Sequence, residues 1–442
     1  MKRIFIFAFL MPTFIIAQQS IKGVFTPAED YNVAILYKVN PTVSKYVANS
    51  EINKDGSFEF KLDSTATKGM YRLVYALPQE DYNFDIIYNG KENIELLFNA
   101  ETGVNFIKSV ENKLLSSYTN SMSMVTQSIG SYFSKRSKDT LALRTIFKIQ
   151  RETQTSFEKA ANGTIALHFI KANKPYIPNR AEDLKTYSNN LKKHYFDFVD
   201  FNNKTLQSSS FLEEKMLNYV FGMLAGSEDE ISNYKKNIDV VGAKMKVIPN
   251  KVKRILWFDL WQQMSDLGLE EVANYISENY LMEVAVALND QELLHALILY
   301  KNISTGSQAP DFDIEIKDKG KLVSKKLSQL TGADNYIIVF WNSSCSHCLE
   351  EVPQLQNYIQ TKEKGLIQVV AIGLEDEPYK WKDLTNNFPT FIHVYGEGKW
   401  DNKIGDAYGV NATPTYFILD KDKKISDKPE DFESVKAFFG DE

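Results

Sequence analysis

Cysteine is scarce in this chain, because only two of its 442 residues are cysteines. An exported protein that relies on disulfide cross-links would have more cysteines, spaced widely along the sequence. Here both lie in one tetrapeptide, Cys345-Ser346-His347-Cys348. A disulfide across so short a loop would add little to stability. The pair is therefore predicted to serve chemistry rather than cross-linking.

An excess of charge of one sign is also lacking, because 51 basic residues face 57 acidic ones and leave a net charge of -6. This balance gives no electrostatic reason to expect a nucleic-acid partner. Long apolar runs are missing beyond the N-terminus, so no later stretch is expected to cross a membrane. With 43% hydrophobic and 24% charged residues, the chain has a globular composition and the length of roughly two to four domains.

The N-terminus carries the pattern of a secretory signal peptide over residues 1–17. Lys2 and Arg3 precede an apolar run over residues 4–16, and Ala17 follows as a small residue at a cleavage point. A membrane anchor is the alternative, but about 13 apolar residues are too few to span a bilayer. No cysteine follows the run, which excludes lipid attachment there. We therefore expect export, cleavage after Ala17 and no stable membrane insertion of the mature protein.

Residues 18–105 are predicted to form an antiparallel β sandwich. Phe58, Phe60 and Leu62 alternate with charged residues, directly after an Asp-Gly turn pair. Such alternation places one face of a strand in a core and the other face in solvent. Short strands separated by glycine, asparagine and aspartate are typical of a small sandwich.

Residues 106–303 are predicted to be α-helical. Apolar residues mark one helix face at every fourth position, as in Leu212, Met216, Val220 and Leu224. Packing between helices is the simplest purpose of such a stripe. The region contains no repeat of fixed length, so nothing favours a solenoid.

The pattern changes again in residues 304–442. Residues 304–310 are small, polar and turn-rich, and we expect them to form a linker. Apolar strands are predicted at 336–341 and 366–374, with a helix over 345–361 between them. Strands that alternate with helices indicate an α/β sheet. The chain is therefore predicted to be multidomain, with a β sandwich, a helical middle region and a C-terminal α/β domain.

The cysteine pair lies where the first turn of a helix is expected. Two cysteines three positions apart on one turn bring their sulfur atoms together, and the free N–H groups and positive dipole end of that turn stabilise a thiolate on Cys345. His347 can add positive charge or a hydrogen bond. Cys348, one turn further in, is expected to be the more buried thiol. Together these residues predict disulfide exchange, which needs a populated thiolate and a second sulfur within reach.

A Cys-x-x-Cys pair can also form half of a zinc site. Zinc needs further ligands, and the chain has no second cysteine pair. The other histidines are scattered along the sequence, at His168, His194, His295 and His393. We therefore expect neither a metal nor a cofactor at the pair.

The residues around the pair resemble the thioredoxin superfamily, and in particular its periplasmic TlpA/ResA-like branch. The resemblance covers about residues 307–442. The matching stretches are Ala309-Pro310-Asp311-Phe312, Leu327-Ser328-Gln329-Leu330, Phe340-Trp341-Asn342-Ser343-Ser344-Cys345, Cys348-Leu349-Glu350-Glu351-Val352-Pro353 and Ala412-Thr413-Pro414-Thr415. The branch inserts an extra helix and strand before the proline, here at about residues 379–395. Exported relatives often carry an N-terminal β domain of unknown function, which the upstream region resembles loosely.

The resemblance implies a role for each main residue of the site. Cys345 would attack a client disulfide, and Cys348 would resolve the mixed disulfide. Glu351 matches the acidic residue of the branch that helps to move protons, with an exposed helical glutamate as the alternative. Pro414, if its peptide bond is cis, would place the backbone beside Thr413 to pair with an extended substrate segment.

Other positions fit the family less directly. Trp341, at the end of the strand that leads to the pair, is expected to join the proline loop in binding substrate, and His347 is expected to take part in catalysis. Ser344 replaces the tryptophan that usually precedes the first cysteine, which affects partner choice. Val339 stands where thioredoxin has a buried aspartate. That last departure leaves Glu351 as the candidate for handling protons.

The direction of exchange stays open on this sequence. The Ser346-His347 dipeptide resembles the oxidising DsbA type, in which a stabilised thiolate makes the disulfide a stronger oxidant. The TlpA/ResA-like branch, in contrast, is usually reducing. These two signals oppose each other.

The sequence thus predicts an exported, periplasmic thiol–disulfide oxidoreductase. Its substrates would be protein or peptide thiols and disulfides, and a redox partner protein would supply or accept electrons. A periplasmic binding or scaffold protein with a secondary redox domain is the alternative, because most of the chain lies outside the redox region. A thiol peroxidase is a weaker hypothesis, since Asn342 stands where peroxidases of this fold have a threonine.

Overall fold

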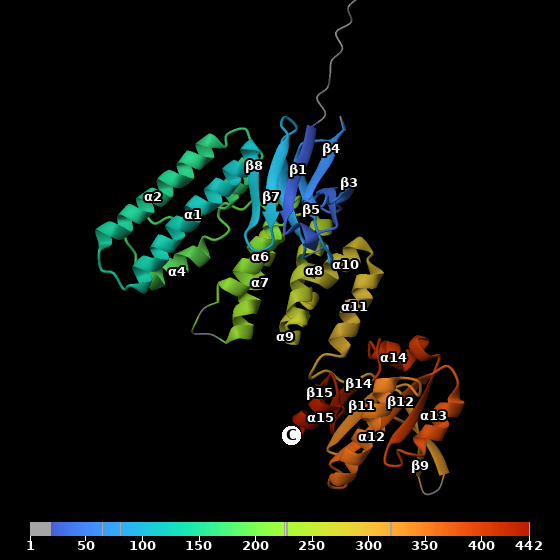
Figure 1. The fold of residues 1–442 in the computed structure, drawn as a ribbon. Coiled ribbons are helices and arrows are strands. Elements are labelled where there is room, and N and C mark those ends of the chain that lie inside the picture. Colours follow the sequence, from blue (N-terminus) through green and yellow to red (C-terminus); the bar gives the residue numbers. More distant parts are fainter. Residues whose placement is uncertain are drawn as a thin grey trace, which may run out of the picture. The chain divides into compact units, whose positions relative to one another are not determined.

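Figure 1 shows the computed structural model, which describes residues 19–63, 65–79, 81–224, 226, 229–318 and 321–441. The signal peptide predicted over residues 1–17 lies outside the described residues. The chain divides into two compact units, Met1–Leu260 and Trp261–Glu442. Each unit is described by itself.

The first unit begins with a sandwich of two four-stranded sheets. One sheet has the order β4-β1-β7-β8, and the other has the order β3-β2-β5-β6. The strands are β1 (Gln19–Thr26), β2 (Val33–Lys38), β3 (Lys45–Glu51), β4 (Ser57–Leu62), β5 (Gly69–Val74), β6 (Asn83–Tyr88), β7 (Ile94–Asn99) and β8 (Gly103–Lys108). Both sheets contribute to one core, for example through Ile21 and Phe60 of one sheet and Leu36 and Leu73 of the other. The predicted sandwich is therefore confirmed.

Strand β4 illustrates why this region forms strands. Phe58, Phe60 and Leu62 are buried, whereas Glu59 and Lys61 are exposed, so one face of the strand lies on the core. One pair of strands departs from the predicted antiparallel arrangement, because β1 runs parallel to β7. Alternation tells which face of a strand is buried, but it does not tell in which direction the neighbouring strand runs.

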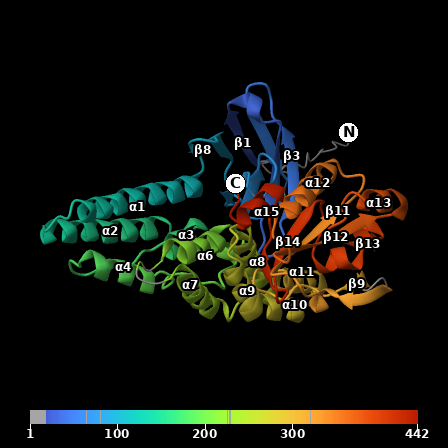
Figure 2. The same cartoon turned by 90° about the horizontal axis from the view of Figure 1, so that it is seen from below.

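Helices fill the rest of the first unit. They are α1 (Val110–Ser134), α2 (Thr140–Ala160), α3 (Ala166–Ala172), α4 (Leu184–Lys193), α5 (Lys204–Gln207), α6 (Phe211–Gly222), α7 (Glu230–Met245) and α8 (Asn250–Asp266), the last of which crosses into the second unit. Helices α1 and α2 run side by side (Figure 2). The predicted stripe is buried at Leu212, Met216 and Val220. Leu224 lies beyond the end of α6 and is 39% exposed, so the stripe is one residue shorter than predicted.

The second unit combines three helices with an α/β domain. The helices are α9 (Glu270–Ile276), α10 (Met282–Leu288) and α11 (Gln291–Asn302). The α/β elements are β9 (Asp313–Asp318), β10 (Lys321–Lys326), β11 (Asn335–Trp341), α12 (Ser346–Thr361), β12 (Ile367–Glu375), α13 (Pro378–Thr385), β13 (Ile392–Glu397), α14 (Lys403–Ala407), β14 (Thr415–Asp420), β15 (Ile425–Asp427) and α15 (Phe432–Phe438). Five strands form one sheet in the order β13-β12-β11-β14-β15, with β11, β12 and β13 parallel to one another. This arrangement agrees with the predicted α/β domain.

Strand β11 lies at the centre of this sheet and is buried on both faces. Ile337 and Val339 belong to the core that contains side chains of α12 and α15, whereas Ile338 and Phe340 belong to the core on the opposite face. A central parallel strand needs apolar residues at every position, because both faces are covered. This explains the uninterrupted apolar run that precedes the cysteine pair.

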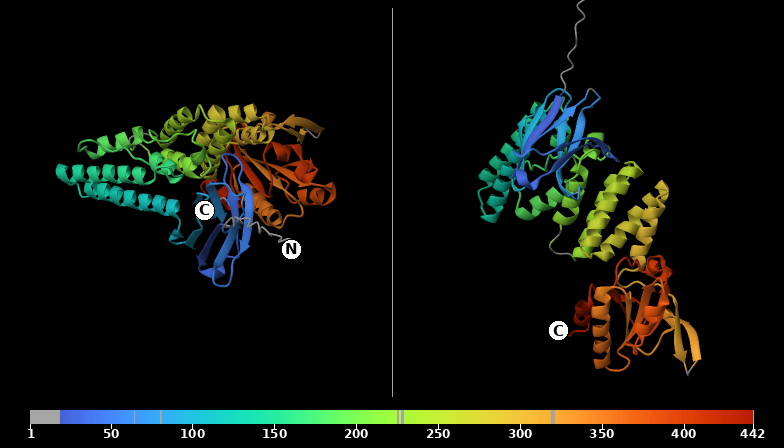
Figure 3. Two further views of the ribbon diagram at one scale, coloured as in Figure 1. Left: turned by 90° about the horizontal axis from the view of Figure 1, so that it is seen from above. Right: turned by 45° about the vertical axis from the view of Figure 1, so that its right-hand side comes forward.

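The sequence prediction missed the hairpin formed by β9 and β10. The hairpin contacts β13 at the edge of the unit (Figure 3). Most residues of β10 are exposed, as expected of a strand that packs against little else. Its apolar pattern was therefore too weak to indicate a strand.

The segment 304–310 is an ordered edge of the α/β domain rather than a free linker. The N–H of Gly306 donates to the carbonyl of Ile425 over 2.7 Å, and the N–H of Ile425 donates to the carbonyl of Ser307 over 2.9 Å. The N–H of Ala309 donates to the carbonyl of Lys423 over 3.0 Å. Composition alone predicted a linker, because the hydrogen-bonding partner lies more than a hundred residues away in the sequence.

The helices α9–α11 are attached to the α/β domain. Glu270 at the start of α9 accepts the N–H of Thr305 over 2.6 Å and forms an ion pair with Lys428. Leu299 and Ile303, at the end of α11, lie against Gly409. These contacts place the division between compact units at residue 260, whereas the sequence prediction divided the helical region from the redox region at residue 303. Within the described part of the chain, no helix has both the length and the apolar character of a membrane span.

Candidate active site

The cysteine pair lies at the carboxyl ends of the parallel strands. Strand β11 ends at Trp341, a short turn follows, and α12 begins at Ser346 with Cys345 as its N-cap. Within the turn, the N–H of Cys345 donates to the carbonyl of Asn342 over 3.1 Å. The strand, the turn and the helix therefore fix the first cysteine at the helix N-terminus, as the sequence predicted.

The sulfur of Cys345 has two backbone neighbours. The N–H of Cys348 donates to this sulfur over 3.3 Å, as an N-cap side chain accepts from the first turn of its helix. The thiol of Cys345 in turn donates to the carbonyl of Thr413 over 3.1 Å. Both cysteines are free thiols; Cys345 is half-buried and Cys348 is fully buried.

The two thiols differ in acidity because their surroundings differ. Burial opposes ionisation of Cys345, but hydrogen bonds from the Cys348 thiol and from the N–H groups of Cys348 and His347 outweigh burial and hold the pKa of Cys345 below its ordinary value. Burial is the larger cause and the hydrogen bond to Cys345 the next, and together they raise the pKa of Cys348 to about 12. When one of the two thiols ionises, the anion therefore resides on Cys345, and the thiolate is the form that attacks disulfides.

The proline loop lies beside the first cysteine. The peptide bond between Thr413 and Pro414 is cis, and β14 begins directly afterwards at Thr415. Because β14 pairs with β11, the loop before it is brought next to the turn after β11. The structure thus places Thr413 and Pro414 beside Cys345, although the two segments are far apart in the sequence.

Glu351 points into the domain from the second turn of α12. Its Oε2 accepts the hydroxyl of Tyr416 over 2.9 Å and the N–H of Phe432 over 3.1 Å. The neighbouring Glu350 is exposed. The alternative of a merely exposed helical glutamate therefore applies to Glu350 and not to Glu351.

Sequence reasoning did not identify Tyr416. This residue is 1% exposed, lies on β14 directly opposite Val339 of β11, and shares a core with Cys348. Burial and the nearby Glu351 raise its pKa, with a smaller effect from Cys348. Its position two residues after Pro414 was the signal that could have suggested it.

Sequence reasoning also did not identify Glu375, at the carboxyl end of β12. Its side chain is buried, with 5% exposed, and it accepts the N–H of Ser343 over 2.5 Å and the hydroxyl of Ser343 over 3.0 Å. The side-chain amide of Asn342 also donates to it, over 3.3 Å. A buried carboxylate thus holds the turn that carries Cys345. The signal was an acidic residue directly after an apolar strand.

Trp341 and His347, the two other expected site residues, differ in exposure. Trp341 has no exposed surface, and its ring packs edge-on against Phe388 at 5.7 Å. It therefore cannot touch a docked substrate in this structure, and its expected place in substrate binding is corrected. The side chain of His347 is exposed, and its backbone N–H is one of the groups that lower the pKa of Cys345.

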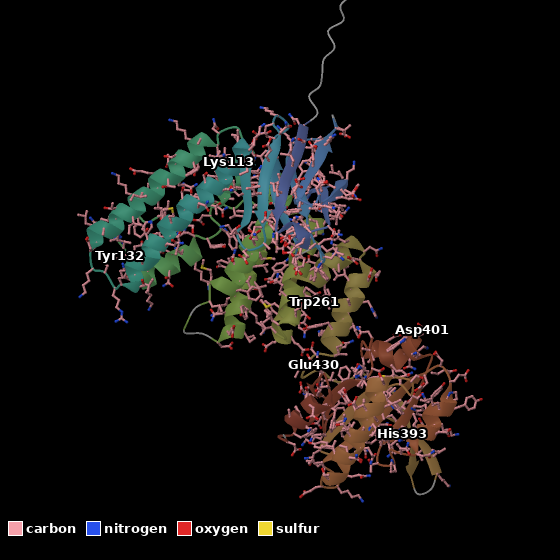
Figure 4. All side chains as sticks on the ribbon, in the orientation of Figure 1. Lys113, Tyr132, Trp261, His393, Asp401 and Glu430 are labelled. Atoms are coloured by element: carbon pink, nitrogen blue, oxygen red, sulfur yellow. The ribbon has the colours of Figure 1, made fainter. Side chains whose placement is uncertain are left out.

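Three of the other histidines have hydrogen-bond partners other than the cysteines. His168 bonds to Asn203 and His194 to Asp197, both in the first unit. His393 lies on β13 of the second unit (Figure 4). Its Nε2 is 2.9 Å from the carbonyl oxygen of Phe388. Among the described residues, no three histidine, cysteine, aspartate or glutamate side chains are grouped as metal ligands.

Comparison with known proteins identifies the region that contains this site. A family model described as Redoxin matches residues 304–436. The thiol-disulfide oxidoreductase ResA of Bacillus thuringiensis subsp. konkukian (strain 97-27) is 30% identical over 139 residues, which cover 28% of this chain and 69% of the relative. ResA of Bacillus subtilis (strain 168) is 30% identical over 130 residues, which cover 28% of this chain and 66% of the relative.

Solved structures are also similar to this region. One is a domain of a possible thiol-disulfide isomerase from Cytophaga hutchinsonii ATCC 33406, which is 27% identical. The alignment covers 31% of this chain and 90% of that domain, with a TM-score of 0.26. On the strength of the ResA relatives, this chain belongs to the TlpA/ResA-like family of thioredoxin-fold thiol–disulfide oxidoreductases.

Proposed function

We propose that this protein is exported to the periplasm and exchanges disulfides with protein or peptide substrates through Cys345 and Cys348. The observation that carries the proposal is the position of the Cys345 sulfur. It caps α12, accepts the N–H of Cys348 and lies against the carbonyl of Thr413. A sulfur held there combines a favoured thiolate with a second thiol one helical turn away, which is what exchange requires.

Exchange proceeds in two balanced steps. The thiolate of Cys345 attacks one sulfur of a client disulfide, forms a mixed disulfide and releases a client thiolate, which takes a proton from water. Cys348 then loses its proton and attacks the sulfur of Cys345. This closes the Cys345–Cys348 disulfide and releases the second client thiolate. Two electrons pass to the client, and the reverse sequence returns them to the protein.

The other site residues take supporting roles in this proposal. Thr413 and Pro414 present backbone to an extended segment of the client. Glu351 receives the proton that Cys348 loses before its attack, because it is the partly buried carboxylate on the same helix, one turn from Cys348. His347 directs its backbone N–H to the Cys345 sulfur and adds an exposed side chain beside the cysteines.

The proposal also covers location and domain organisation. We place signal cleavage after Ala17 and divide the mature chain into a β region (18–105), a helical region (106–303) and a redox region (304–442). The charged start and short apolar run support export. Strand β8 ends at Lys108, three residues beyond the proposed end of the β region, and α1 begins at Val110. The sheet hydrogen bonds from Gly306 onward support the start of the redox region.

Turnover of a disulfide substrate tests the function. The purified chain, kept reduced with dithiothreitol, should accelerate reduction of insulin disulfides, and Cys345→Ser should abolish the acceleration because the attacking sulfur is gone. Glu350→Gln is a matched control on the exposed side of α12 and should keep the wild-type rate. A wild-type rate in Cys345→Ser would remove Cys345 from its role. No acceleration by the wild-type chain would favour the binding or scaffold alternative.

A further inference from the structure

The resolving cysteine, Cys348, must lose its proton inside the folded domain. Cys348 is fully buried, and its pKa is raised to about 12, yet it must become a thiolate to attack the mixed disulfide. Water alone reaches such a group poorly. A nearby acceptor for the proton is therefore needed inside the domain.

Glu351 can accept a proton only if its carboxylate is held toward the interior. Two donors hold it there, one from each of two other elements. The hydroxyl of Tyr416 comes from β14, and the N–H of Phe432 is the first N–H of α15, which has no partner within its own helix. Both donate to Oε2, and Oε1 has no hydrogen bond to any described residue. Oε1 is thus free to take a proton.

Of these two donors, Tyr416 is the one whose side-chain hydroxyl also interacts electrostatically with Cys348. It lies opposite Val339, which occupies the strand position where thioredoxin has a buried aspartate. Tyr416 and Cys348 belong to the same core. The ionisable groups that act on its hydroxyl are Glu351 and Cys348 on α12 and Asp431 before α15. Strand β14 therefore brings a hydroxyl onto the carboxylate of Glu351, within the core that also contains Cys348.

We propose that Tyr416 is a positioning residue for the resolving step, and that its hydroxyl holds the carboxylate of Glu351 where it receives the proton of Cys348. This inference rests on the proposed function and assigns a role to a residue outside the cysteine motif and the proline loop. Tyr416 touches no substrate. It acts through Glu351, so its loss should affect only the step that deprotonates Cys348.

The test separates the two steps with 5,5′-dithiobis-(2-nitrobenzoate). Cys345 of the reduced protein attacks the reagent and releases one thionitrobenzoate, and Cys348 then displaces a second one as the internal disulfide closes. Stopped-flow absorbance follows both phases. In Tyr416→Phe, which removes only the hydroxyl, the first phase should stay unchanged and the second should slow about tenfold at pH 7.

The pH profile distinguishes positioning from a loss of stability. Without the hydroxyl, deprotonation of Cys348 depends more on solvent hydroxide, so the pH at half-maximal rate of the second phase should rise. Tyr358→Phe is the matched control, because the hydroxyl of Tyr358 also binds a carboxylate, that of Asp441, away from the cysteines. This control should leave both phases unchanged.

A double-mutant cycle tests whether Tyr416 acts through Glu351. Glu351→Gln should slow the second phase, and adding Tyr416→Phe should slow it no further. A second phase in Tyr416→Phe with the wild-type rate and pH profile would overturn the inference, as would independent, additive effects of the two substitutions. If the wild-type protein released no second thionitrobenzoate, the proposed function itself would fail, which is a different result.

Discussion

The chemistry of this protein depends on a difference between two identical side chains. Cys345 caps a helix and accepts the N–H of Cys348, whereas Cys348 is enclosed on all sides. Hydrogen bonds to the Cys345 sulfur lower its pKa despite burial, and burial raises the pKa of Cys348. The three-residue spacing produces this difference, because it places one sulfur at the tip of the helix and the other a turn inward.

Alkylation should follow this difference in acidity. Iodoacetamide reacts with thiolates. In the folded, reduced protein, labelling of Cys345 should therefore begin at a lower pH than labelling of an ordinary cysteine. Cys348, with a pKa of about 12, should stay unlabelled up to pH 9. Peptide mass analysis after timed labelling measures both sites. In urea both cysteines should react alike, and equal labelling in the folded state would contradict the account.

At the scale of elements, the site is assembled where a helix begins and three parallel strands end. The turn between β11 and α12 carries Cys345, and the end of β12 supplies Glu375 to hold that turn. The side chain of Asn342 ties the turn further, with its amide 2.5 Å from the carbonyl of Leu374 and its Oδ1 accepting the N–H of Ser344. Neighbouring strand ends thus set the geometry at the cysteine.

Glu375→Ala should therefore destabilise the fold and slow exchange together. The substitution leaves the buried N–H and hydroxyl of Ser343 without their acceptor, which should lower the free energy of unfolding by about 2 kcal/mol. The displaced turn should also slow the reaction of Cys345. Urea unfolding and the rate of insulin reduction measure the two effects. Asp376→Asn removes the exposed carboxylate next in sequence and should change neither the stability nor the rate. A Glu375→Ala protein as stable and as active as this control would contradict the role of Glu375 in holding the turn.

The elements that sequence could predict are those with a local pattern. Strand β11 and helix α12 lie within one or two residues of their predicted ranges, because a doubly buried strand and a capped helix both leave continuous signals. The cysteine pair at the helix start followed from spacing alone. The direction in which Trp341 points could not be predicted, since a strand buried on both faces shows no alternation.

Contacts between distant segments were the part that sequence could not supply. Tyr416 meets Glu351, and Glu375 meets Ser343, only because β14 and β12 lie on either side of β11. Neither pair has a recognisable spacing. For the same reason, the sequence could not predict the parallel pairing of β1 with β7 or the hydrogen bonds of Gly306.

At the scale of the whole molecule, the redox site belongs to a unit larger than the thioredoxin-like domain. Helices α9–α11 are joined to it through Glu270, which contacts both Thr305 and Lys428. The first unit, with its sandwich and helices, contains neither of the two cysteines. All thiol chemistry of the chain is therefore confined to the second unit.

The central claim is that Cys345 and Cys348 form and break one disulfide as a two-electron couple. The most direct test equilibrates the full chain with mixtures of oxidised and reduced dithiothreitol, alkylates the free thiols and counts the labels by intact mass. The account predicts two populations only, with zero or two labels, that interconvert reversibly along a single Nernst curve. A chain that keeps two labels under every mixture, or that collects singly labelled molecules instead, would contradict it.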